Sequence, residues 1–114
     1  MDLINDIQML MEELTRSIKK LRDTGKALAE AERDYKVTLR QEALKLRIEK
    51  DMPVTLINQI IFGVPEVAEK RFKRDIAETI YNANQEHINA TKLKLRLLES
   101  QLNREWGVSG KNEI

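Results

Sequence analysis

Two long stretches without proline flank one short apolar connection, and this layout constrains the fold more than any other feature. The first stretch runs from Asp2 to Lys50 with Gly25 as its single glycine. The second runs from Glu66 to Trp106 and contains no glycine. Because proline and glycine are the residues that most often interrupt helices, the pattern predicts two long helices joined by a short elbow, defined here as residues 51–65.

In both stretches apolar residues recur every three or four positions, which is the period of one helix face. The first row comprises Ile7, Met11, Leu14, Ile18, Leu21, Leu28, Tyr35, Leu39 and Leu46. The second comprises Phe72, Ile76, Ile80, Ile88, Leu95, Leu98, Leu102 and Trp106. The sequence therefore predicts an all-α fold, a long antiparallel two-helix hairpin with a short helix at the tip and coiled-coil packing.

Cap residues predict the ends of each helix within one domain at residues 1–106. Asp2 is suited to cap a first helix over about 2–50, and Pro53 to begin a short helix over about 53–62. Gly63 is expected to end that helix in a left-handed conformation, and Pro65 to open the last helix, over about 65–106. Residues 107–114 are expected to form a flexible tail.

Composition excludes several classes of protein. The net charge is only +1, so no global field indicates a nucleic-acid or membrane partner. The chain has no cysteine, which excludes disulfides and thiolate metal sites. No apolar run approaches the roughly 20 residues of a membrane span, and the acidic start is unlike a signal peptide. We expect no membrane association and a cytoplasmic location.

No pattern of catalytic or metal-binding residues stands out. His87 is the single histidine, and the positions one helical turn away carry no second ligand. Carboxylates are plentiful, but a helical hairpin offers grooves where a catalytic pair needs a pocket. There is also no glycine-rich phosphate loop and no nucleophile elbow. We therefore expect no catalytic residue, no metal, no cofactor and no enzymatic activity.

The elbow carries more apolar residues than a two-helix seam can cover. Some of them should cap the end of the seam, with Ile57 and Ile61 turned inward. The alternative is an exposed patch that binds another protein. The predicted protein-binding residues are Leu56, Ile57, Ile60, Ile61 and Phe62.

The open end of the hairpin is also broadly apolar on both helices, and antiparallel pairing is expected to place residues near 10 beside residues near 105. A second copy of the chain is the simplest cover, which predicts a homodimer or tetramer. The predicted oligomer interface comprises Ile7, Leu10, Met11, Leu14, Leu95, Leu98, Leu102 and Trp106.

Two basic clusters on the second helix support an alternative function, contact with nucleic acid. They comprise Lys70, Arg71, Lys73 and Arg74, and Lys92, Lys94 and Arg96. The second cluster is expected to join Lys19, Lys20 and Arg22 in a basic belt. Interspersed acidic residues and the lack of interleaved aromatics favour a solvated, salt-bridged surface instead. A structural or scaffolding role is a further alternative.

Several segments resemble small helical-hairpin proteins encoded by temperate phages and prophages of Gram-positive bacteria. These segments are residues 51–57, 63–69, 71–75 and 104–106. The resemblance covers most of the chain. It implies an accessory protein that binds a host or phage protein, with replication, recombination or defence as its setting, and it carries over no catalytic residue.

Overall fold

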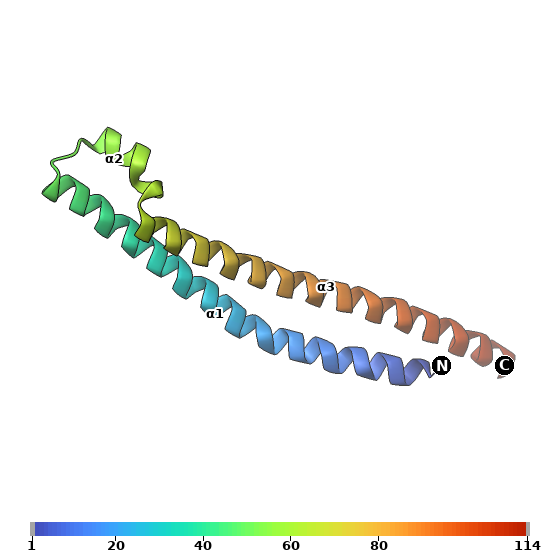
Figure 1. The fold of residues 1–114 in the computed structure, drawn as a ribbon. Coiled ribbons are helices and arrows are strands. Elements are labelled where there is room, and N and C mark those ends of the chain that lie inside the picture. The colour runs from blue at the N-terminus through green and yellow to red at the C-terminus, as the bar shows by residue number, and fades with distance from the viewer. Residues whose placement is uncertain (1, 114) are drawn as a thin grey trace. The chain divides into compact units, whose positions relative to one another are not determined.

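The computed structural model describes the backbone of residues 2–113 and the side chains of residues 2–107. It contains four helices in the order α1 (Leu3–Glu49), α2 (Val54–Ile60), the 3₁₀ helix η1 (Ile61–Gly63) and α3 (Pro65–Glu113). Figure 1 shows α1 and α3 running in opposite directions, with α2 in the connection between them. The predicted all-α hairpin with a short helix between two long helices is confirmed.

Two compact units share the long helices. Unit 1 comprises Met1–Arg22 and Ala83–Ile114, and unit 2 comprises Asp23–Asn82. In each unit one stretch of α1 packs against one stretch of α3. The elbow belongs to unit 2.

In unit 1 the buried and partly buried residues other than Asp6 and Glu13 follow a seven-residue repeat, with steps that alternate between three and four. On α1 they are Leu3, Ile7, Leu10, Leu14, Ser17 and Leu21, and on α3 they are Asn84, Ile88, Thr91, Leu95, Leu98 and Leu102. A strict repeat of seven keeps the same stripe facing a neighbouring helix, as in a coiled coil. This seam is the core of unit 1.

Two polar side chains within the unit 1 seam are hydrogen-bonded, one across the seam and one along α3. The Asn84 side-chain amide donates a hydrogen bond of 3.1 Å to the carbonyl of Ser17. The buried hydroxyl of Thr91 donates to the carbonyl of His87, one turn earlier on α3. A polar group inside a seam is satisfied only in the register that supplies its partner, so Asn84 specifies the pairing.

This register differs from the predicted one. Leu10 lines a shallow groove together with Leu98, and Leu3 and Ile4 line another with Trp106. Residues near 10 therefore lie beside residues in the nineties, not near 105. The register depends on how many residues the elbow uses, which apolar spacing alone does not reveal.

In unit 2 the α3 side of the seam also departs from the predicted row. The repeat continues on α3 as Val67, Lys70, Arg74, Ala77 and Tyr81, and on α1 as Thr24, Leu28, Ala31 and Tyr35. Phe72, Ile76 and Ile80, which were expected to face α1, are exposed instead. Steps of four drift away from a 3.5-residue period, so these three side chains lie outside the stripe set by Val67 and Tyr81.

The main core of unit 2 lies where the elbow meets both long helices. Tyr35, Ile57, Ile61 and Val67 form its buried cluster, and Val67 is fully enclosed. Partly buried apolar residues surround the cluster, namely Leu39, Ala43, Leu46, Met52 and Val64. The residues in α1, α2, η1 and α3 that form this core are therefore brought together by the elbow.

The helix ends are mostly where the sequence predicts them. The Asp2 carboxylate accepts hydrogen bonds from the amides of Ile4 and Asn5, which confirms it as the cap of α1. Pro53 is the extended residue immediately before α2, and Pro65 is the first residue of α3. At the other end α3 continues to Glu113 and does not stop near Trp106, because no proline follows and a helix tolerates an isolated glycine such as Gly107. Ile114 and the side chains of 108–113 lie outside the described residues.

The turn after α1 uses an aspartate where a left-handed residue is needed. Asp51 has a φ of 49°, whereas no glycine in the described chain has a positive φ, so the prediction for Gly63 was wrong. The amide of Met52 donates to the carbonyl of Leu46, and the Arg47 guanidinium donates to the carbonyl of Met52 at 3.0 Å. Aspartate tolerates this backbone better than most residues, which explains why a turn forms without glycine.

Gly25 allows a close approach between α1 and α3 within unit 2. A Cβ atom added at this position would lie 3.2 Å from the Cε1 atom of Tyr81. A glycine inside a long helix can allow either close packing or a kink, and this distance supports packing.

Candidate functional site

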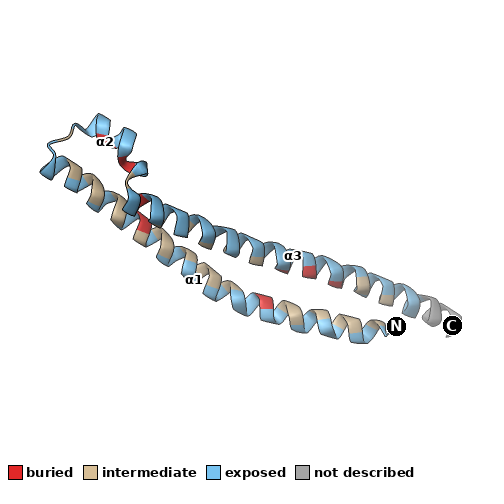
Figure 2. Cartoon of the chain, in the orientation of Figure 1, coloured by how far each residue is buried: buried red, intermediate tan, exposed pale blue. Residues whose placement is uncertain are grey.

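The elbow holds α2 in place through two isoleucines one helical turn apart. Ile57 in α2 and Ile61 in η1 both point into the unit 2 core, where they pack with Tyr35 and Val67. Because a short helix has little stability of its own, these buried contacts are what hold it in position. Figure 2 shows the buried positions of the connection beside a surface that is otherwise exposed.

The other side of the same helix presents apolar residues to solvent. Leu56 and Ile60 are also one turn apart, and with Val54 and Phe62 they form what we call the elbow surface. Each of the four is roughly 40–60% exposed. Thr55, Asn58 and Gln59 are exposed around them and carry no charge. The exposed side chains of the elbow are therefore apolar or uncharged, and Ile57 and Ile61 fix the segment to the core.

A cation–π contact borders the elbow surface. The guanidinium carbon of Arg71, on the first turns of α3, lies 5.3 Å from the centre of the Phe62 ring. Such a contact restrains an exposed ring and places a positive charge beside it. Phe62 and Arg71 therefore form one edge of the surface together.

The structure divides the five predicted protein-binding residues into two groups. Leu56, Ile60 and Phe62 lie on the elbow surface, whereas Ile57 and Ile61 are buried and cannot contact a partner. Val54 belongs to the surface but was not among the five. The alternative in which Ile57 and Ile61 turn inward to cap the seam is therefore confirmed for these two residues, which share a helix face because they are four positions apart.

The predicted oligomer residues divide in a similar way. Met11 and Trp106 are exposed. The other six lie within the seam of unit 1, where Leu95 is buried and Ile7, Leu10, Leu14, Leu98 and Leu102 are partly buried. The seam between α1 and α3 thus already uses most of the apolar arc that a second chain was expected to cover.

The first basic cluster is largely engaged within unit 2. Arg74 stacks over the ring of Tyr35 at 4.7 Å and contacts the Asp75 carboxylate at 2.9 Å, and Lys73 lies 3.8 Å from that of Glu69. With Arg71 over Phe62, three of the four basic residues have neighbours in their own chain. These contacts favour a structural role for the cluster.

The second basic cluster does not form the predicted belt. The bond between Asn84 and Ser17 places Lys19, Lys20 and Arg22 level with the beginning of the α3 segment of unit 1. The His87–Glu13 pair shows which parts of the two helices lie side by side. Lys92 and Lys94 follow His87 on α3, so they lie beside the acidic part of α1 that precedes Glu13. The basic residues of α1 and α3 are therefore separated along the helix axis.

His87 faces a carboxylate of the opposite helix in unit 1. Its Nε2 atom lies 3.0 Å from a carboxylate oxygen of Glu13, and both side chains are about half exposed. The part of the chain with described side chains contains no group of three potential metal-ligating residues. Within residues 2–113 neither long helix includes a stretch apolar enough to cross a membrane.

The described side chains form exposed surfaces of apolar and charged residues. The buried core of unit 2 holds the elbow surface in place. In comparisons with protein-family models, curated proteins and solved structures, nothing matches this chain.

Proposed function

We propose that this chain is a non-enzymatic interaction protein that binds a protein partner through the elbow surface. The observation that carries the proposal is the two-sided elbow, in which Ile57 and Ile61 anchor the segment while Leu56, Ile60 and Phe62 remain exposed. A surface already ordered before binding loses little conformational entropy when a partner docks.

The composition of the elbow surface favours a protein partner. Exposed apolar side chains with a polar rim are typical of protein-binding patches, and aromatic and arginine residues contribute most to binding energy in such interfaces. Phe62 and Arg71 supply that pair here. The exposed Thr55, Asn58 and Gln59 carry no charge, so they provide no array of positive charge for phosphates.

The resemblance to temperate-phage proteins suggests the kind of partner. If the chain is a phage accessory protein, the elbow surface binds a host or phage protein in the bacterial cytoplasm. The oligomer, if one forms, then presents more than one elbow surface to that partner.

The test compares two double variants, each of which replaces two exposed apolar residues of unit 2 with serine. Ile60→Ser with Phe62→Ser removes half of the elbow surface, and Val37→Ser with Leu44→Ser removes two exposed residues from α1 in the same unit. Partners captured by the tagged wild-type chain are identified by mass spectrometry, purified and titrated against each variant. We expect the elbow variant to bind at least about 30-fold more weakly, since truncating one binding hot spot costs roughly 2 kcal/mol.

Circular dichroism of both variants checks that helix content is unchanged. Equal affinity of the elbow variant and the wild type for the purified partner would disprove the proposal. Binding to DNA or RNA that falls steeply with salt, and that is insensitive to the elbow variant, would favour the nucleic-acid alternative.

A further inference from the structure

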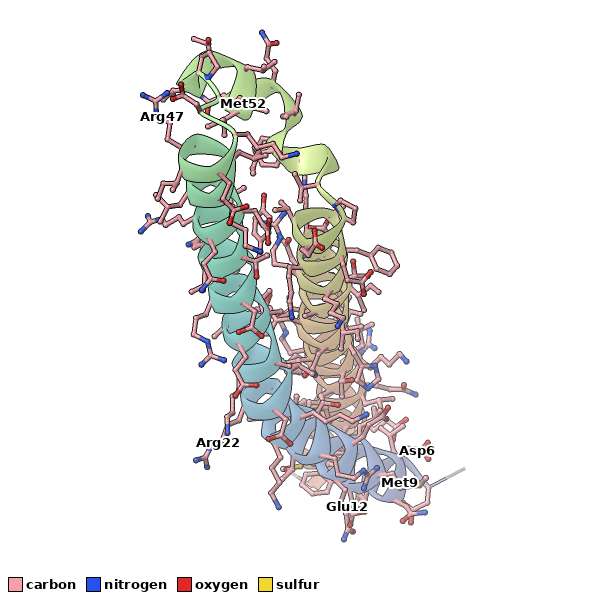
Figure 3. The ribbon with its side chains drawn as sticks, turned by 60° about the vertical axis from the view of Figure 1, so that its left-hand side comes forward. Asp6, Met9, Glu12, Arg22, Arg47 and Met52 are labelled. Atoms are coloured by element: carbon pink, nitrogen blue, oxygen red, sulfur yellow. The ribbon has the colours of Figure 1, made fainter. Side chains whose placement is uncertain are left out.

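Unit 1 contains a groove whose apolar floor is bordered by carboxylates. The groove has a volume of about 400 Å³, and Met9, Leu10 and Leu98 supply its apolar side chains. Its charged lining comprises Asp6, Glu12, Glu13 and Arg16. Figure 3 labels Asp6, Met9 and Glu12 together at the beginning of α1. Met9 is 59% exposed, so the floor is open to solvent.

The α3 segment of the same unit presents a ridge of matching character. Leu93 and Leu97 are one turn apart, and they are 53% and 61% exposed. Lys94 lies beside them, and Arg104 follows Leu97 by two turns on the same side of the helix. We call these four residues the basic ridge. It combines exposed leucines with positive charge, where the groove combines an exposed methionine with negative charge.

The groove and the basic ridge lie at the same level along the helices. Leu98 lines the groove opposite Leu10, and it directly follows Leu97 of the ridge. Rotating a copy of unit 1 by half a turn about an axis parallel to its helices leaves the position of every residue along that axis unchanged. The ridge of each copy then meets the groove of the other, so the contact is self-complementary as a two-fold dimer requires.

We infer that a second copy of this chain occupies the groove, forming a dimer through unit 1. Leu97 of each copy packs against Met9 of the other, and Lys94 lies near Asp6 and Glu12. Glu86, one heptad before Leu93 on α3, faces Arg16, which is the single basic residue of the groove. Charge complementarity at both ends of the groove selects this occupant, and four helices then surround the buried methionine and leucines.

The inferred interface differs from the predicted one and is independent of the elbow surface. Most of the residues predicted to bind a second copy are used in the seam of unit 1. Met9, Leu93 and Leu97 lie outside that seam and remain available. The elbow belongs to unit 2, so either proposal can fail while the other stands.

Charge reversal in matched pairs tests the dimer. One variant carries Asp6→Lys with Glu12→Lys, and the other carries Lys94→Glu with Arg104→Glu. In a homodimer of either variant, the groove and the basic ridge that meet carry charges of the same sign at both contacts. In a heterodimer of the two variants, they carry opposite charges at both contacts. We expect the wild type to dimerise, each variant to dissociate at least about tenfold more readily, and an equimolar mixture to regain the dimer.

Light scattering coupled to size exclusion measures mass over a range of concentrations, and native mass spectrometry identifies the one-to-one heterodimer. The control Glu49→Lys with Glu78→Lys makes the charge change of the Asp6→Lys, Glu12→Lys variant in unit 2 and should dimerise as the wild type does. Circular dichroism of every variant checks folding. A monomeric wild type, dimeric charge variants, or a mixture that stays monomeric would each overturn the inference. Loss of the dimer in the Ile60→Ser, Phe62→Ser variant would also overturn it.

Discussion

Replacing Ile60 and Ile61 separately with alanine should give very different losses of stability, although the two residues are adjacent and chemically identical. Ile61 is 4% exposed in the unit 2 core, and Ile60 is 39% exposed on the elbow surface. The substitution removes the same atoms in both cases. Any difference between the variants therefore reports on which side of the elbow each residue faces.

The magnitudes follow from burial. Truncating isoleucine to alanine removes three carbons, worth roughly 2.4 kcal/mol when fully buried at about 0.8 kcal/mol for each. At Ile61 an unfilled space adds to this, which gives about 3 kcal/mol within the usual range of roughly 2–5 kcal/mol. At Ile60 less apolar surface is lost, no enclosed cavity forms, and alanine is a better helix former, so we expect less than about 1.5 kcal/mol.

Urea unfolding followed by far-UV circular dichroism measures the two losses at one fixed, low protein concentration. Hydrogen exchange of residues 54–67 adds a local measurement, because the elbow can open without the rest of the chain unfolding. Ile61→Val provides an intermediate point, at roughly 0.5–1.5 kcal/mol. Equal losses at Ile60 and Ile61, or a larger loss at Ile60, would refute the division of the elbow into a buried and an exposed side.

Substitutions that probe Gly25, Asp51 and Arg74 test other features of unit 2 by thermal or urea unfolding. Gly25→Ala should stabilise the chain by less than the roughly 1 kcal/mol typical of an open helix site, because the new Cβ meets the Tyr81 ring. A full gain of about 1 kcal/mol would contradict close packing. In a Tyr81→Ala background, Gly25→Ala should give the full gain. Asp51→Val should destabilise by about 1–2 kcal/mol at its positive φ, whereas Asp51→Asn should remain near wild type; equal stabilities would argue against the left-handed turn. Arg74→Met keeps an apolar stem but removes the charge over Tyr35, and a loss of about 0.5–2 kcal/mol is expected, whereas no loss would exclude a stabilising cation–π contact.

The fold was predictable because its signals are local. Long stretches without proline, apolar residues at helical spacing, and the caps at Asp2 and Pro65 each act within one or two turns of helix. The register was not predictable from these signals. It depends on contacts between residues far apart in the chain, such as Asn84 with Ser17, and on the number of residues in the elbow.

The candidate site was half predictable for a related reason. The sequence showed that the elbow has surplus apolar residues and offered Ile57 and Ile61 as its inward side, but it did not decide between that arrangement and an exposed patch that includes both residues. The answer depends on Tyr35 and Val67, which supply the surface that receives Ile57 and Ile61. Likewise the sequence predicted Phe72, Ile76 and Ile80 on the seam. In the structure the seam follows Val67 and Tyr81, and the three predicted residues are exposed.

The position of the unit 2 core has a consequence for the order in which the chain folds. Tyr35 and Val67 are about half as far apart in sequence as Ser17 and Asn84, which are separated by 67 residues. Each doubling of the length of a closed loop adds roughly 0.6 kcal/mol of entropic cost. Contacts in the unit 2 core therefore cost less entropy than the Asn84–Ser17 contact and should form first. Once it has formed, the remaining turns of α1 and α3 are held close together and can pair one after another. The elbow then acts as a nucleus, and mutations there should slow folding, whereas mutations in the unit 1 seam should mainly speed unfolding.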